Sequence, residues 1–580
     1  MMWTSLMWIS LMHGVPGREM EGITMTSLYL SDQYAPVTDE VTVFDLPVVG
    51  TIPAELAGRY LRNGPNPATE PDHATHHWFV GDGMVHGVRL ADGKASWYRN
   101  RYVGSTRMSE LRGTPDIAGP NWNDSPGGPN TNVGGFAGTT WAMVEAGGCP
   151  VELTYELDTV GRNDFFGTLP GAFTAHPKVD PDTGEMHAVV YAWPQWMDHV
   201  QYVVVGADGK VRRSVDVPLP GMAMVHDMSL TQRFAVVYDM PVTVDFDLAF
   251  AGRFPFRWNP DYGSRLGLLP REGEASDIVW VDAPICYSYH PMNAYDAPDG
   301  TVVIDLCVYD RMFDSDILGP FGDGFARLER WVVNPITRTV ITTVIDSAAT
   351  EFPRHRGSLT AKPYRYGYCA SPSTGPTWPT FKYDLHTGER STFDHGAGRS
   401  GGEPVFVGRQ GGVEEDDGWL VTLVHDATTD GTELAIIDAQ DFGRGYVARV
   451  ALPARVPYGF HGNWVSDRSV PPPHDADCPH ALRLQRARGS RAVAQNDWVA
   501  ATTRARTAAC SSARSSIRLP GNVGSASTSA MIGAGWAMWY SPIATACSWS
   551  SRRRAAAGSI SSTSATSCVV VCERVITAVL

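Results

Sequence analysis

Four of the 17 histidines lie in sequence contexts that could serve metal chemistry. Each lies where a turn meets an apolar or aromatic run: His176 in AFTAHPKVD, His226 in MVHDMSL, His290 in YSYHPMNAYD and His461 in YGFHGNWV. Neutral imidazole is a common ligand of iron, copper, nickel and zinc. The intervals of 50, 64 and 171 residues match no local ligand motif such as H-E-x-x-H. Taken one at a time, each of the four is more readily explained as a buried structural histidine.

The other histidines give weaker indications. His73, His76 and His77 lie in the polar stretch PDHATHHW, which predicts solvated side chains. Five more lie beside predicted turns and are interpreted as structural: His187, His199, His355, His386 and His395. A metal site in this chain therefore depends on a fold that brings the four separated histidines together.

Residues 41–465 consist of short alternating or β-branched runs, such as MHAVVYAW and GTVVIDLCVYD, separated by Gly, Pro and Asp turns. Runs with a period of two predict strands, and Asp208-Gly209 is typical of a hairpin turn. So many hairpins must close or stack their sheets to protect their edges. A propeller of seven blades with about 60 residues each fits this length. No strict repeat is present, so length alone favours a propeller over a sandwich. Intervals of blade size would let separate blades each contribute one histidine to the axis.

The formal net charge of −15 over 580 residues is unevenly distributed. Residues 466–580 carry 13 Arg, no Lys and 5 acidic residues, a net charge of +8, which leaves −23 on residues 1–465. An acidic body argues against a nucleic-acid partner, because such binders displace phosphate counterions with a basic surface. The segment 466–580 is rich in Ser, Ala and Arg without strand or helix periodicity. Two interpretations stay open for it: a disordered low-complexity tail, or translation out of frame.

The chain is thus predicted to have three parts: an N-terminal extension at 1–40, a propeller at 41–465 and a tail at 466–580. Residues 3–12 resemble an export signal, but no Lys or Arg precedes them and no clear cleavage site follows. Met20 and Met25 are alternative starts. No apolar run approaches the roughly 20 residues that span a bilayer.

The cysteines of the body indicate a reducing compartment. Cys149, Cys286, Cys307 and Cys369 are too scattered for a disulfide framework or a C-x-x-C metal site. We therefore expect a cytoplasmic protein that is peripherally membrane-associated at most.

Nine stretches of the body, in order, resemble the carotenoid cleavage oxygenase family, which also contains stilbene-cleaving dioxygenases and the retinoid isomerase of the visual cycle. They are GTIPAELAGRYLRNGPNP, WFVGDGMVHGVRL, FTAHPKVDP, MVHDMSLTQRFAVVYDMP, FPFRWNPDYGSRLGLLPR, YSYHPMNAYD, EFPRHRG, GGEPVFVGR and YGFHGNWV. The resemblance covers residues 50–465. It implies an all-β, seven-bladed β-propeller with one non-haem Fe(II) on its axis, O2 as co-substrate and no organic cofactor.

The resemblance also implies the residues of the site. The iron ligands would be His176, His226, His290 and His461. Three glutamates would accept hydrogen bonds from three of these histidines: Glu145 from His226, Glu351 from His290 and Glu403 from His461. Four imidazoles without a carboxylate ligand leave the metal its full charge and open positions. A carboxylate partner fixes the tautomer and the orientation of each ligating ring.

The implied reaction inserts O2 across one C=C bond of a conjugated polyene or a stilbene and gives two carbonyl products. Candidate apolar contacts to such a substrate are Phe136, Phe173, Tyr289 and Phe460. In the phenolic stilbene cleavers a lysine precedes the first of the three glutamates and binds the phenol, whereas Val144 stands here. This departure favours a carotenoid or apocarotenoid substrate, with Tyr102 as a candidate polar contact for a stilbenoid.

Three alternatives stay open. The enzyme could cleave stilbenoids, or isomerise and cleave an ester, and a non-catalytic propeller scaffold is the alternative outside enzymes. The complete set of four histidines and three glutamates argues against a scaffold. The apolar stretch 246–256 is a candidate membrane-facing patch, since exposed apolar clusters with a basic residue favour an interface, but core burial explains it equally well.

Overall fold

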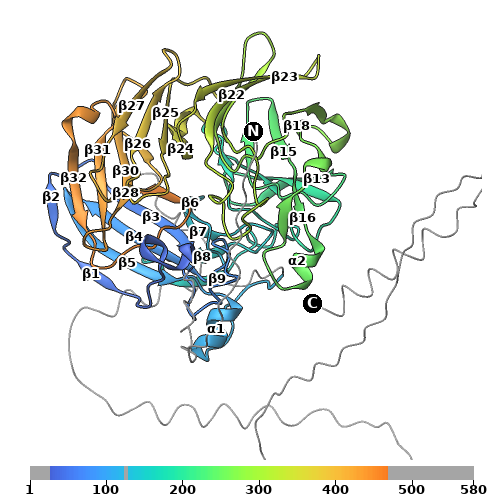
Figure 1. The fold of residues 1–580 in the computed structure, drawn as a ribbon. Helices are drawn as coiled ribbons and strands as arrows, with labels where there is room; N and C mark the ends of the chain where they lie inside the picture. Colours follow the sequence, from blue (N-terminus) through green and yellow to red (C-terminus); the bar gives the residue numbers. More distant parts are fainter. Residues whose placement is uncertain (1–26, 123–127, 468–580) are drawn as a thin grey trace, which may run out of the picture. The chain divides into compact units, whose positions relative to one another are not determined.

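The computed structural model describes residues 27–122 and 128–467. Within these residues, seven antiparallel sheets of four or more strands follow one another along the chain, and a two-stranded ribbon accompanies them. The sheets stand around a common axis as the blades of a propeller, with colours running from blue to orange around the ring (Figure 1). The predicted all-β, seven-bladed fold is confirmed.

The strands of the first four blades have the following bounds. Blade 1 holds β3 (Gly58–Pro65), β4 (Gly83–Ala91) and β5 (Lys94–Tyr102), and blade 2 holds β6 (Asn132–Phe136), β7 (Thr139–Met143), β8 (Val151–Leu153) and β9 (Thr159–Arg162). Blade 3 holds β10 (Lys178–Val179), β11 (Met186–Val190), β12 (His199–Val205) and β13 (Val211–Pro218). Blade 4 holds β14 (Met228–Leu230), β15 (Phe234–Asp239), β18 (Arg265–Pro270) and β19 (Val279–Asp282).

The remaining blades follow in the same order. Blade 5 holds β20 (Pro291–Asp296), β21 (Val302–Val308), β22 (Arg327–Asn334) and β23 (Thr339–Asp346), and blade 6 holds β24 (Glu351–His355), β25 (Tyr366–Ala370), β26 (Thr380–Asp384) and β27 (Glu389–Phe393). Blade 7 holds β28 (Arg399–Gly401), β29 (Val405–Gly408), β30 (Gly418–Asp426), β31 (Gly431–Asp438) and β32 (Tyr446–Ala451).

Strands from the two ends of the described chain close the ring. The last strand, β33 (Gly462–Ser466), pairs antiparallel with β3 from Gly58↔Ser466 to Arg62↔Gly462. From the other end, β1 (Thr42–Phe44) extends blade 1 beside β5, and β2 (Val48–Gly50) extends blade 7 beside β32. Blue β2 and orange β32 lie side by side in Figure 1. Because β33 is fully paired, the blade that follows His461 is closed.

Helices are short and lie between strands. They are α1 (Thr106–Arg112), α2 (Phe246–Phe250) and the 3-10 turns η1 (Leu28–Leu30), η2 (Asp32–Tyr34), η3 (Pro260–Tyr262), η4 (Ala275–Asp277), η5 (Gly357–Leu359) and η6 (Phe442–Arg444). The ribbon of β16 (Val242–Val244) and β17 (Phe256–Trp258) flanks α2, which begins where Asp245 accepts from the backbone N–H of Leu248 at 3.1 Å. The candidate membrane-facing stretch 246–256 thus lies in the segment that connects β15 and β18 of blade 4.

Burial changes across each blade. The strand β21 is buried along its whole length, whereas the outermost strand of the same blade, β23, is largely exposed. Outer strand β13 alternates between buried and exposed residues, the pattern of a strand with one face on the core. The hairpin between β12 and β13 turns at Gly209 with φ 79°, as the Asp-Gly pair predicts.

The described N-terminal segment packs against the propeller. Tyr29 and Tyr34 are buried and contact the ring of Trp78 at centroid distances of 5.7 and 5.4 Å. Part of the predicted extension at 1–40 therefore belongs to the folded body. The predictions for residues 3–12, the alternative starts and the tail beyond Asp467 lie outside the described residues.

Candidate metal centre

Each of the seven blades contributes one polar residue to the axis. Each histidine lies within two residues before an edge strand of its blade, namely β10, β14, β20 or β33. The glutamates lie at the start of a strand or between two strands. They are His461 for blade 1, Glu145 for blade 2, His176 for blade 3, His226 for blade 4, His290 for blade 5, Glu351 for blade 6 and Glu403 for blade 7. Residues hundreds of positions apart thus share one site, which no local motif could show.

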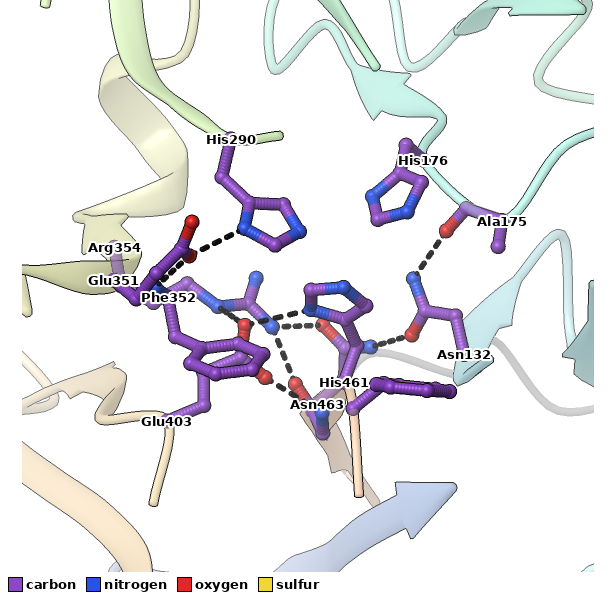
Figure 2. Close-up of polar contacts among 12 residues, drawn as sticks. Asn132, Ala175, His176, His290, Glu351, Phe352, Arg354, Glu403, His461 and Asn463 are labelled. Atoms are coloured by element: carbon purple, nitrogen blue, oxygen red, sulfur yellow. Dashed lines mark hydrogen bonds and ion pairs between the residues drawn. The ribbon is translucent and has the colours of Figure 1, made fainter. Parts of the chain in front are cut away.

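The four imidazoles form one buried group. Each histidine is between 5% and 9% exposed, and one ligand atom from each lies within 4.8 Å of those of the others. Ring centroids of His176 and His226 are 4.2 Å apart, and those of His290 and His461 are 4.8 Å apart. Figure 2 shows the rings of His176, His290 and His461 around a common space. The structure therefore brings together all four histidines that the sequence indicated.

Three of the histidines face carboxylates through Nδ1. His290 Nδ1 lies 2.6 Å from Glu351 Oε2, and His461 Nδ1 lies 3.0 Å from Glu403 Oε1. His226 Nδ1 lies 2.7 Å from an oxygen of Glu145, although the angle is not that of a hydrogen bond. An ionised carboxylate only accepts, so each Nδ1 must carry the proton. Each Nε2 is then left with a lone pair.

These lone pairs test whether a metal fits. Nε2 of His226 and Nε2 of His290 are 3.2 Å apart. Two lone pairs at this distance repel each other unless a proton or a metal cation lies between them. Buried, neutral imidazoles with carboxylates behind them are the donor set of a transition-metal site. The residues present fit a metal such as iron.

His176 has different surroundings. Its Nε2 lies 3.3 Å from Glu145 Oε1, and its Nδ1 lies 3.7 Å from Asp227 Oδ2. Asp227 is buried and is paired with Lys178 at 2.8 Å. The fourth histidine therefore shares a carboxylate with His226 rather than having one of its own.

Burial and facing carboxylates act in opposite directions on the pKa of the axial histidines. Burial lowers the pKa of His176 well below its ordinary value, and the neighbouring histidines lower it further. It also lowers the pKa of His461 to about 4, although Glu403 acts in the opposite direction. At His290 burial again lowers the pKa, but the charge and hydrogen bond of Glu351 outweigh it and raise the pKa above its usual value. His176 and His461 are therefore neutral at pH 7, as metal ligation requires.

The carboxylates stay ionised despite their burial. Burial alone would raise the pKa of Glu351 and of Glu403. The facing His290 more than offsets this at Glu351, and Arg354 together with His461 does so at Glu403, so that both pKa values lie below the ordinary one. The site therefore holds fixed negative charge behind its imidazoles.

Backbone strain accompanies two of the glutamates. Ala146, which follows Glu145, has φ 59°, and Phe352, which follows Glu351, has φ 52°. The pairing of β24 with β25 shifts register between Glu351 and Arg354. Such bulges redirect side chains, and left-handed non-glycine residues concentrate at functional sites. This bulge carries both Glu351 and Arg354 of the same strand into polar contacts near the axis.

The predicted substrate contacts divide into two groups. Tyr289 lies edge-on to His226 at 4.7 Å, and Phe460 lies 5.4 Å from the ring of Phe79. Phe136 and Phe173 instead pack in a hydrophobic cluster formed by blades 2 and 3. The position immediately before Glu145, Val144, is buried as expected.

Tyr102, the candidate polar contact, lies apart from the aromatic residues near the histidines. Its hydroxyl accepts from Asn66 Nδ2 at 2.6 Å and donates to the carbonyl of Val37 at 3.2 Å. Its ring packs in a cluster with Met84 and Met108. The hydroxyl that sequence analysis assigned to a stilbenoid is thus engaged within the protein.

The prediction that His76 and His77 are solvated is wrong. They are 8% and 2% exposed, because rings from distant segments cover this loop. The ring of His77 stacks on Phe254 at 3.7 Å and meets Phe313 at 5.2 Å. Its Nδ1 accepts from the backbone N–H of Phe79 at 3.0 Å, so Nε2 carries the proton, and this N–H has no partner among the described residues.

These rings belong to a continuous aromatic wall, of which the sequence indicated Tyr289 and Phe460 as substrate contacts but not the other members. Its members are His77, Phe79, Phe254, Phe313, Tyr289 and Phe460. The wall leads from His226, which Tyr289 contacts, to the segment that follows α2. On α2 itself, Phe246 and Phe250 are 40% and 66% exposed. Among the described residues no helix is both long and apolar enough to cross a membrane.

Known sequences resemble the whole propeller. Residues 34–466 match the family model described as retinal pigment epithelial membrane protein. A carotenoid cleavage oxygenase of Mycobacterium tuberculosis is 43% identical over 488 residues, which cover 75% of this chain and 97% of that protein. A carotenoid 9,10(9',10')-cleavage dioxygenase of Crocus sativus is 32% identical over 499 residues, 76% of this chain and 90% of that protein.

Solved structures resemble it as well. The lignostilbene dioxygenase of Pseudomonas brassicacearum superposes with a TM-score of 0.69 at 28% identity and covers 76% of this chain and 99% of its own. The cobalt-substituted apocarotenoid oxygenase of Synechocystis superposes with a TM-score of 0.67 at 26% identity and covers 76% and 98%. The likeness thus extends over nearly the full length of both proteins.

Proposed function

This chain belongs to the carotenoid cleavage oxygenase family, and on that premise we propose that it is a dioxygenase that cleaves one C=C bond of a carotenoid or apocarotenoid into two carbonyl products. The observation that carries this conclusion is the convergence of four buried imidazoles backed by three carboxylates. A non-catalytic scaffold would have no use for such a buried polar group, which costs stability unless it performs a function.

We assign the metal to His176, His226, His290 and His461, and its identity to Fe(II), one per chain. A bound ferrous ion would supply the activation of O2, and no organic cofactor is needed. The protein's part is to hold the imidazoles. Glu351 and Glu403 keep the Nδ1 protons of His290 and His461 in place, so that each Nε2 presents its lone pair to the centre. All four imidazoles are buried from bulk solvent.

The aromatic wall is the proposed binding surface for the substrate. Its rings present apolar faces between His226 and the segment after α2, where a linear polyene could lie. Val144 offers no donor to a phenolate, which favours a polyene. The structural likeness to a lignostilbene dioxygenase supports a stilbenoid as the second candidate substrate.

Substrate uptake from a lipid surface is proposed at α2. Phe246 and Phe250 expose aromatic rings, Arg253 follows them, and the wall begins at Phe254. Exposed apolar residues beside a basic one favour an interface with a bilayer. The functional unit proposed for this activity is the propeller at 41–465.

The test starts with anaerobic purification of the full chain and metal analysis. The protein is then mixed with O2 enriched in oxygen-18 and with a forty-carbon carotenoid, an apocarotenal or a hydroxystilbene. We expect about one iron per chain and paired carbonyl products that each carry one labelled oxygen. An iron-loaded, folded protein that cleaves none of the three would contradict the proposed activity, and cleavage of the hydroxystilbene alone would select the second candidate.

A further inference from the structure

A chain of hydrogen bonds runs from the carboxylate behind His461 to the backbone beside His176, the two histidines whose ring centroids are 4.7 Å apart. Arg354 Nε donates to Glu403 Oε1 at 2.9 Å, and this oxygen also accepts from His461 Nδ1. Arg354 Nη2 donates to Asn463 Oδ1 at 3.2 Å and to the carbonyl of Gly462. Figure 2 shows this network beside the imidazoles.

The chain continues to the backbone beside His176. Asn463 Nδ2 donates to Asn132 Oδ1 at 2.9 Å and to the carbonyl of Val133 at 2.8 Å. Asn132 Nδ2 donates to the carbonyl of Ala175, the residue before His176, at 2.6 Å. Five blades are thereby joined: blade 7 through Glu403, blade 6 through Arg354, blade 1 through Asn463, blade 2 through Asn132 and blade 3 through Ala175.

The chain has a defined polarity. Arg354 can only donate, so Asn463 must turn its oxygen toward the guanidinium and its amide nitrogen toward the two oxygens of blade 2. Asn132 Oδ1 accepts from Asn463, which leaves its nitrogen for Ala175. A flip of either amide would place two donors or two acceptors face to face. Each side chain therefore has one orientation that satisfies its neighbours.

The three glutamates are held differently. Tyr191 donates to Glu145 at 2.9 Å, and Tyr309 donates to Glu351 at 3.0 Å, so both have neutral hydroxyl partners. Among the described residues, only Glu403 of the three is paired with a guanidinium. A planar guanidinium fixes the direction of a carboxylate more strictly than a hydroxyl, which can rotate.

We propose that Arg354 and Asn463 are positioning residues that fix His461 relative to His176. Arg354 holds Glu403 in the orientation that receives His461, and Asn463 transmits that position through Asn132 to the strand end that carries His176. This inference rests on the proposed function, because it takes the four histidines as the metal ligands. The function would be to set metal retention and coordination geometry rather than to contact substrate.

Cobalt(II) is the probe for the test, because its visible absorption reports coordination geometry without turnover. Full-length wild type, Arg354→Lys, Asn463→Leu and Asn463→Ala are stripped of metal, loaded with Co(II) and titrated against a chelator. Outer partners of metal ligands typically contribute about 10- to 100-fold in metal affinity. We expect losses of Co(II) affinity in this range for Arg354→Lys and Asn463→Leu, together with a shifted Co(II) spectrum. Lys keeps the positive charge of Arg354 but lacks the planar guanidinium that bonds to both Glu403 and Asn463, and Leu cannot hydrogen-bond to Asn132.

The matched control is Arg330→Gln. Arg330 pairs with the buried Asp305 at 2.8 and 2.9 Å in blade 5, outside the hydrogen-bond network described above. Removing the Arg330 guanidinium therefore lowers stability without changing a partner of the four histidines. Its Co(II) spectrum and affinity should match wild type. The milder Asn463→Ala provides the answer if Asn463→Leu fails to fold.

The outcomes separate the two claims. Wild type that binds no stoichiometric Co(II) would remove the metal assignment itself. Wild type that binds Co(II), with Arg354→Lys and an Asn463 variant that match it in affinity and spectrum, would overturn the positioning role alone. A lower kcat with an unchanged KM in the iron-loaded variants would agree with the role, since the hydrogen bonds of both residues go to polar groups beside the histidines.

Discussion

Buried histidines occur both on the axis and inside the blades, and their partners differ. Three blade histidines meet a tyrosine hydroxyl through Nδ1: His86 with Tyr98 at 2.9 Å, His187 with Tyr202 at 2.8 Å and His395 with Tyr446 at 2.9 Å. The axial histidines His290 and His461 meet glutamates instead. Burial lowers the pKa of all three blade histidines, to about 3 for His86 and about 4 for the others.

The difference in partner separates structure from function. A tyrosine hydroxyl can donate or accept, so it tolerates either tautomer of the imidazole. A carboxylate only accepts, and so it forces the proton onto Nδ1 and frees the Nε2 lone pair. Burial alone thus does not mark a ligand in this chain, and neither does any carboxylate, because the buried His425 of blade 7 meets the exposed Asp430 through Nε2 at 3.1 Å. The axial histidines His290 and His461 are distinguished by a buried carboxylate at Nδ1.

The largest expected effect comes from removing an axial imidazole. His226→Ala or His290→Ala should abolish iron retention and turnover, because the metal would lose one of its four proposed ligands. Metal analysis and product formation measure this.

The blade variant His187→Ala is the control. It loses contacts with Tyr202 and Arg271 and should cost about 1–3 kcal/mol of stability, yet keep iron and activity. Wild-type turnover in either axial variant would break the distinction between the two classes.

The carboxylate is the next element to change. Glu351→Gln can donate to His290 and no longer forces the proton onto Nδ1, so iron affinity should fall about 10- to 100-fold while the fold persists. Chelator competition measures it. Glu329→Gln is the matched control, because Glu329 is also buried but accepts from Trp331 within blade 5. Equal iron affinity in the two variants would show that the partner's charge does not matter.

The sequence predicted the framework because its signals are local. Alternating runs and Asp-Gly turns indicate strands and hairpins wherever they occur, and blade-sized intervals follow from repetition of one architecture. The four histidines were singled out because each lies where a turn meets an apolar or aromatic run, and the family resemblance joined them into one site. The sequence could not show which buried histidines face a carboxylate and which face a tyrosine. Tyr202 and Glu351 come near His187 and His290 only in the folded chain.

Failures of the prediction share one physical cause. His77 was expected to be solvated because its neighbours in the sequence are polar, yet Phe254 and Phe313 cover it from far along the chain. Tyr102 stays a candidate contact for a stilbenoid, and its hydrogen bond with Asn66 could likewise not be predicted from local sequence. The hydrogen bond between Arg354 and Asn463 joins two different blades, so neither residue could be identified from its own segment. Contacts made by tertiary packing leave no mark in local sequence.

A smaller effect concerns pH. His395 has a folded pKa of about 4 against about 6.5 when unfolded. Between these values the unfolded chain binds a proton that the folded chain does not, so stability falls as pH drops from about 6.5 to about 4. His395→Gln should reduce that slope by up to about 1.4 kcal/mol per pH unit. Urea unfolding of metal-free protein between pH 7 and 5 measures it, and an unchanged slope would mean that His395 is already charged in the folded state.

The smallest expected effect concerns His77, whose Nδ1 faces neither a carboxylate nor a tyrosine. His77 accepts from a backbone N–H and leaves its Nε2–H without a protein partner in the described residues. If the aromatic wall binds substrate, this N–H is a donor for an oxygen atom of the substrate. His77→Phe keeps the ring that packs on Phe254 and should raise KM for an apocarotenal about fivefold, equivalent to one hydrogen bond of about 1 kcal/mol. KM for a hydrocarbon carotene and the iron content should not change. An equal rise for both substrates would assign His77 to packing alone, because only a hydrogen bond distinguishes the oxygenated chain from the hydrocarbon.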